Sequence, residues 1–129
     1  MKEIVFQYRV LENVSALSTE DAQLLIKARA ATAKAYAPYS QFQVGAVALL
    51  NNGETIEGTN QENASYPVGI CAERVLLSAV SSFYNGVAIK TIAISCHNLK
   101  GESKNPVSPC GICRQSLLEQ TIRQHQPIK

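Results

Sequence analysis

The stretch VGAVALLNNGETIEGT, residues 44–59, decides the fold of this chain because it predicts a β-hairpin. Val44 to Leu50 is an apolar, strand-like run, and Thr55 to Thr59 is a second short strand. Between them lies Asn52-Gly53, a pair that favours the tight turns of two-residue hairpins. The sequence therefore predicts two neighbouring antiparallel strands.

Helical patterns flank this hairpin on both sides. Before it, Ser18 and Asp21 resemble a capping box, and the helix they begin should end near Ala37-Pro38, because the residue before a proline resists helical geometry. The apolar positions that repeat at helical spacing are Leu24, Leu25, Ala28, Ala31 and Ala35. After the hairpin, a helix should run from near Cys71 to about Phe83 and stop at Asn85-Gly86.

The remaining pattern completes an α/β fold. Thr91 to Cys96 predicts a third, buried strand, and Ser108-Pro109 provides an N-cap and a first-turn proline for a last helix that continues past Leu118. Helix, hairpin, helix, strand and helix together predict a mixed β-sheet packed between helices. Without an internal repeat or a linker-like segment, we expect residues 1–129 to form a single domain.

Charge and composition narrow the classes of partner. Lys plus Arg number 12 against 10 for Asp plus Glu, and the basic residues are scattered, so no nucleic-acid partner is expected. Residues 1–10 mix charged with apolar side chains and predict neither a signal peptide nor a membrane span. We therefore expect a cytoplasmic protein with no membrane partner. In a reducing compartment, its 4 cysteines favour metal binding or chemistry over disulfides.

Three of these cysteines and one glutamate form a pattern that points to a metal. Cys110 and Cys113 are three residues apart, so they share one face of the predicted helix, and Cys71 would supply a third ligand from another helix start. Catalytic zinc sites use three protein ligands and leave a fourth position for water. Glu73 lies two residues from Cys71, within reach of such a water.

Other interpretations of these residues stay open at this point. Cys-x-x-Cys alone also occurs in structural zinc sites and redox dithiols, and Cys96 with His97 could close the site with a fourth protein ligand. Glu73 taken alone is an ordinary first-turn glutamate. Arg74 is either a solvated charge or a donor of hydrogen bonds to the cysteine sulfurs.

At this point the sequence resembles the small, homotetrameric cytidine deaminases of the three-cysteine zinc type. Motifs in the order and spacing of that family carry the resemblance from about residue 20 to residue 118: Tyr36-Ala37-Pro38-Tyr39-Ser40, Phe42-Gln43-Val44-Gly45-Ala46, Asn60-Gln61-Glu62-Asn63-Ala64-Ser65-Tyr66, Ile70-Cys71-Ala72-Glu73-Arg74 and Pro109-Cys110-Gly111-Ile112-Cys113-Arg114-Gln115. Such a combination is far more specific than any single motif.

The resemblance implies a three-layer α/β/α fold and a role for each matching position. It implies one Zn²⁺ per subunit on Cys71, Cys110 and Cys113, with Glu73 as the catalytic acid and base and Arg74 beside the ligands. The substrate-binding residues it implies are Phe42, against the pyrimidine ring, Asn60 and Glu62, on the ribose hydroxyls, Ala64, Tyr66, toward a neighbouring subunit's site, and Ala72.

The implied activity is the zinc-dependent hydrolytic deamination of cytidine and deoxycytidine to uridine and deoxyuridine, with release of ammonia, in pyrimidine salvage. The implied assembly is a homotetramer, with a dimer as the alternative. Another small-molecule deaminase of the same fold, such as a blasticidin-type enzyme, and a non-catalytic zinc-stabilised binding protein remain as alternative functions. In one respect the chain departs from the family pattern, because the C-terminal strand and tail of such proteins do not follow Lys129.

Overall fold

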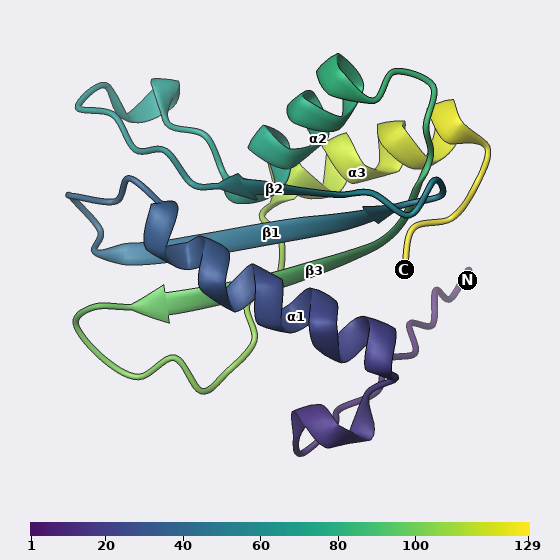
Figure 1. Ribbon diagram of the computed structural model, residues 1–129, viewed down its shortest axis with the longest axis horizontal. Coiled ribbons are helices and arrows are strands. Elements are labelled where there is room, and N and C mark those ends of the chain that lie inside the picture. The colour runs from purple at the N-terminus through teal and green to yellow at the C-terminus, as the bar shows by residue number, and fades with distance from the viewer.

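The computed structural model describes residues 1–129 and shows three layers (Figure 1). The middle layer is a sheet of β1 (Phe42–Leu50), β2 (Thr55–Thr59) and β3 (Ile89–Asn98) in the order β2-β1-β3. Helix α1 (Thr19–Ala31) covers one face, and α2 (Ala72–Phe83) and α3 (Gly111–Gln124) cover the other. Short 3₁₀ turns occupy Val14–Ala16, Thr32–Lys34 and Tyr66–Val68. The predicted α/β fold is confirmed.

The hairpin that the sequence predicts forms between β1 and β2. The two strands pair antiparallel with Ala46 opposite Gly58, and Gly53 turns the chain with a φ angle of 87°. A positive φ of this size is accessible to glycine at little steric cost, which explains why Gly53 occupies this position. The hairpin brings residues 59–62 back to the start of β1.

The central strand β1 is buried on both faces of the sheet. Ala46, Ala48 and Leu50 pack into the core beneath α2, whereas Val47 packs against α1. Side chains alternate between the two faces of a strand, so a strand covered by helices on both sides must be apolar throughout. The uninterrupted run from Val44 to Leu50 is therefore the sequence signature of the three-layer arrangement.

Two glycines let helices approach the sheet at backbone distance. A Cβ built on Gly58 would lie 2.4 Å from the amide nitrogen of Leu76 and 2.5 Å from the carbonyl oxygen of Ala72, both in α2. A Cβ on Gly45 would lie 2.4 Å from the carbonyl oxygen of Ala28 in α1. Gly58 thus determines how closely the first turn of α2 approaches the sheet.

Three elements, α1, β3 and α3, differ in their bounds from the prediction. Helix α1 begins after Ser18, whose hydroxyl accepts the amide of Asp21 as expected, but it ends at Ala31 rather than near Ala37-Pro38. The hydroxyl of Thr32 bonds the carbonyl of Arg29 and tightens the last turn into a 3₁₀ helix. Strand β3 is longer than predicted, extending from Ile89 to Asn98.

Helix α3 begins later than predicted, at Gly111 with Cys110 as its N-cap. Ser108 and Pro109 therefore precede the helix instead of starting it. The first intrahelical bond runs from the amide of Arg114 to the carbonyl of Cys110, 2.9 Å away.

The sheet, expected to be mixed, is antiparallel over its three strands. Parallel pairing enters at the outer edge of β3, where the Lys129 amide donates to Lys90 and the Lys129 carbonyl accepts from Ile92. None of the helices is long and apolar enough to cross a bilayer.

Replacing Gly58 with alanine should destabilise the fold by about 2 kcal/mol or more, because the added methyl group meets backbone atoms of α2 that cannot rotate away. Thermal or urea unfolding of the metal-free protein measures this change. Gly111→Ala is the matched control, since its Cβ would meet nothing within 4 Å. Equal stability of the two variants would contradict the packing described for α2 on β2.

Candidate zinc site

Three cysteine sulfurs from two helix starts converge at one point. The Sγ atoms of Cys71 and Cys110 are 3.9 Å apart, and those of Cys110 and Cys113 are 3.5 Å apart. All three lie within 4.8 Å of one another. Sulfurs bonded at about 2.3 Å to a tetrahedral ion lie about 3.8 Å apart, so this spacing fits zinc.

The local structure explains why these residues meet. Cys71 is the N-cap of α2 and Cys110 is the N-cap of α3, so both helices direct their first turns at the cluster. The carbonyl of Cys71 accepts the amide of Val75, which opens α2. The guanidinium of Arg114 donates from Nε to the carbonyl of Pro109 at 2.9 Å and holds the segment that carries Cys110.

The three thiols differ in their surroundings. Cys110 is exposed, and a hydrogen bond from the backbone amide of Cys113, together with one between the two thiols, lowers the pKa of Cys110 below the ordinary range. Burial raises the pKa of Cys71 and of Cys113 instead. A helix N-terminus is expected to lower a thiol pKa, and this expectation holds at Cys110 but fails at Cys71, where loss of solvent outweighs it. A bound dication would favour the thiolate form of all three.

Glu73 lies in the first turn of α2, beside the sulfurs. It is buried, with 5% of its surface exposed. Its carboxylate is close enough to contribute to the raised pKa of both Cys71 and Cys113. Glu73 is therefore a buried neighbour of the Cys71 and Cys113 sulfurs.

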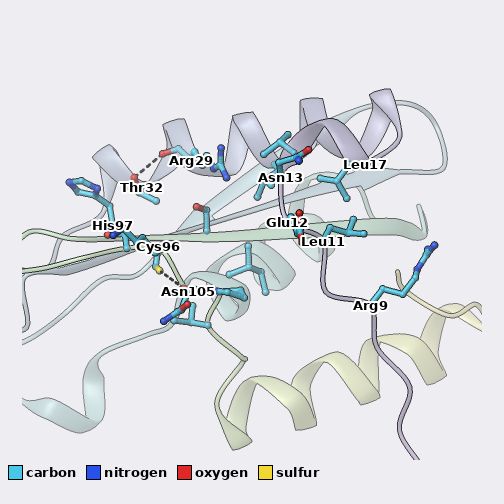
Figure 2. Close-up of a pocket in the computed structure, with 18 residues that line it drawn as sticks. Arg9, Leu11, Glu12, Asn13, Leu17, Arg29, Thr32, Cys96, His97 and Asn105 are labelled. Carbon is cyan, nitrogen blue, oxygen red and sulfur yellow. Dashed lines mark hydrogen bonds between the residues drawn. The ribbon is translucent and has the colours of Figure 1, made fainter.

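The other candidate ligands lie elsewhere. Cys96 and His97 line a cavity of about 600 Å³ between α1, β3, the N-terminal segment and the loop of residues 103–107 (Figure 2). There the Cys96 thiol points to the carbonyl of Asn105, at 3.9 Å. The cluster thus contains three protein donors, the number found in catalytic rather than structural zinc sites.

Residues 60–62, the rim, follow β2 and lie beside the segment that leads into Cys71. Gln61 pairs with Ile70, the residue before Cys71, and also with Tyr36. The Asn60 side chain accepts the Val44 amide at 2.7 Å and donates to the Phe42 carbonyl at 2.9 Å. These contacts join the rim to the residue before Cys71 on one side and to the start of β1 on the other.

The remaining residues implied by the resemblance lie in three different settings. Ala72 is fully buried under β2. Ala64 and Tyr66 lie on the exposed loop between β2 and α2, with Tyr66 92% exposed. Arg74 lines a groove between α2 and α3, and none of its hydrogen bonds is to a cysteine sulfur. The proposed donation from Arg74 to the sulfurs therefore stays a prediction.

Sequence reasoning gave no role to Ser40, and for Arg114 it offered only a contribution beside Arg74 to the tuning of the cysteine sulfurs. In the structure, Arg114 bonds the Pro109 carbonyl and Ser40 bonds the Glu62 carboxylate. Both residues lie inside the stretches that carry the family resemblance. The contact between Ser40 and Glu62 joins residues 22 positions apart, so sequence spacing does not reveal it.

Replacing any one of Cys71, Cys110 and Cys113 with serine should abolish stoichiometric zinc binding, because the cluster supplies no spare sulfur. Cys96→Ser is the matched control and should retain one zinc ion per chain. Metal content after dialysis, measured by mass spectrometry, tests both. Loss of zinc from the Cys96 variant, or its retention by the other three, would contradict this assignment.

Comparison with known proteins agrees with this geometry. The profile of the cytidine and deoxycytidylate deaminase zinc-binding region matches residues 18–126. The chain is 45% identical over 100 residues to the cytidine deaminase of Halalkalibacterium halodurans, covering 77% of this chain and 71% of that protein. It is 43% identical over 89 residues to a cytidine deaminase of Mycobacterium tuberculosis, covering 69% of this chain and 62% of that protein.

Solved structures show the same likeness. The crystal structure of cytidine deaminase from Mycobacterium tuberculosis superposes with a TM-score of 0.69 at 37% identity, over 80% of this chain and 79% of that one. That of Burkholderia pseudomallei superposes with a TM-score of 0.64 at 40% identity, over 79% and 76% of the two chains. With its three converging thiols and this coverage, the chain belongs to the cytidine deaminase family of zinc-binding enzymes.

Proposed function

We propose that this chain catalyses the hydrolytic deamination of cytidine and deoxycytidine to uridine and deoxyuridine, with release of ammonia. The observation that carries the proposal is the placement of one buried carboxylate, Glu73, beside three convergent cysteines. Cys71, Cys110 and Cys113 would hold one Zn²⁺. A zinc ion in such a site lowers the pKa of water and supplies a nucleophile near neutral pH.

Glu73 performs the proton transfers in this proposal. As a carboxylate it accepts a proton from water and delivers it to ring N3, which breaks the aromaticity of the pyrimidine as the new C4–O bond forms. It then takes the proton of the new C4 hydroxyl and delivers it to the exocyclic amine, so the C4–N bond breaks, ammonia leaves and a C4=O bond forms. The burial of Glu73 limits competing contact with bulk water, and one group serves in turn as base and acid.

Recognition of the nucleoside falls to the rim. Phe42 would pack its flat ring against the pyrimidine, and Glu62 would accept a hydrogen bond from a sugar hydroxyl. In the structure, both polar atoms of the Asn60 side chain already bond backbone groups of β1, at Phe42 and Val44. Asn60 therefore holds the start of β1 in place, in addition to any contact that it makes with the sugar. Ala64 and Ala72 would complete the lining, and Arg74 would act beside the ligands.

We further propose a homo-oligomer, as a tetramer or a dimer, in which Tyr66 serves a neighbouring site. The supporting observation is the exposure of large apolar side chains near the cysteines in sequence: Tyr66 is 92%, Val68 63% and Ile112 63% exposed. Exposed large apolar side chains are typical of an interface when they gather in one patch. A cytoplasmic role in pyrimidine salvage is also proposed, and the free thiols of all the cysteines suit a reducing compartment.

Glu73→Ala should retain zinc and lose at least about a hundredfold in kcat, because a single proton-transferring group contributes that much or more. The decrease in cytidine absorbance measures turnover, and mass spectrometry measures bound zinc. Glu54→Ala, which removes an exposed carboxylate in the β1–β2 turn, is the control and should keep full activity. Near-normal turnover by the Glu73 variant would refute the assigned role.

A further inference from the structure

The turn of residues 38–40, between α1 and β1, binds the carboxylate of Glu62. The backbone amides of Tyr39 and Ser40 donate to Glu62 Oε2 at 2.9 and 3.2 Å, and the Ser40 hydroxyl donates to Oε1. These donors contact both oxygens of the carboxylate. A carboxylate held at both oxygens by one turn has a fixed plane, whereas a solvated glutamate samples several rotamers.

The backbone of this turn adopts an uncommon conformation at Gln41. Gln41 has a φ angle of 58°, in the left-handed region that residues other than glycine rarely adopt. The Gln41 amide bonds the Ala37 carbonyl at 3.0 Å, and the Gln41 carbonyl accepts the amide of Leu99 at 2.9 Å. One bond within the turn and one bond to a distant segment therefore hold an unfavourable conformation, as is common at functional sites.

Ser40 connects two residues of the proposed nucleoside site. While its hydroxyl donates to Glu62, the same oxygen accepts the amide of Phe42 at 3.1 Å. One hydroxyl thus links the carboxylate on the sugar side to the residue on the base side. The hydrogen bond from Ser40 is also the largest cause of the lowered pKa of Glu62, so the carboxylate stays ionised and able to accept.

We propose that Ser40 is a positioning residue for nucleoside recognition: its hydroxyl fixes the orientation of Glu62 so that the carboxylate meets the sugar hydroxyl without first being ordered. This inference rests on the proposed function. Because Ser40 acts through Glu62 on binding, its loss should weaken substrate binding and leave the chemistry at Glu73 unchanged.

The test is steady-state kinetics of Ser40→Ala in the zinc-loaded protein. For cytidine, KM should rise about five- to tenfold, in line with the loss of one hydrogen bond to an ionised group at an exposed site, and kcat should stay within about twofold. With 2′,3′-dideoxycytidine, which lacks the sugar hydroxyls, the wild type and the variant should have equal KM. Ser40→Thr keeps the hydroxyl and should restore the wild-type KM.

A second variant separates positioning from general disruption of the turn. In a Glu62→Gln background, adding Ser40→Ala should change the KM for cytidine by less than about twofold, because Ser40 then has no carboxylate to orient. Two results would overturn the inference. One is a five- to tenfold rise in the KM for cytidine when Ser40→Ala is added to Glu62→Gln, and the other is the same rise in the KM of Ser40→Ala for the dideoxy substrate. An unchanged KM for Ser40→Ala with cytidine would overturn it as well. Failure of the wild type to turn over cytidine would instead refute the proposed function, and the inference with it.

Discussion

The structure depends on two helices beginning at the same point. Cys71 ends an extended segment and starts α2, and Cys110 ends another and starts α3. Neither helix start could be displaced by a few ångströms without separating the sulfurs beyond the reach of one ion. The packing beneath α2 and α3 must therefore hold the first turns of both helices at fixed positions.

The sheet supplies that packing. Gly58 admits the backbone of α2 to contact distance, and the small side chains of Ala46 and Ala48 continue the close approach. Leu76 is fully buried and packs α2 against this surface. In the first turn of α3, Cys113 is also fully buried. The hairpin meanwhile returns residues 60–62 beside the segment that leads into Cys71, so the same strands that support the helices also build the rim of the site.

Much of this arrangement is predictable from sequence, and the reasons are local. The hairpin follows from an apolar run and Asn52-Gly53, and α1 begins where Ser18 provides a cap. The spacing of the three cysteines and the expected helix starts predict one cluster, and the structure brings the three together. The predicted start of α3 is wrong because Ser108-Pro109 is a strong local signal, whereas the actual cap, Cys110, is a residue with little capping preference.

What sequence could not provide depends on contacts between distant segments. The left-handed Gln41 is stabilised by Leu99, and the grip on Glu62 joins residues more than twenty positions apart. After the early end of α1, the chain pairs Tyr36 with Gln61, another contact between segments that are distant in sequence.

The central claim is that three sulfurs hold one zinc ion with a fourth position left to water. X-ray absorption at the zinc edge of the loaded protein measures this directly. The account predicts three sulfur neighbours at about 2.3 Å and one oxygen neighbour at about 2.0 Å. Four sulfurs, or three sulfurs with an imidazole nitrogen, would contradict it.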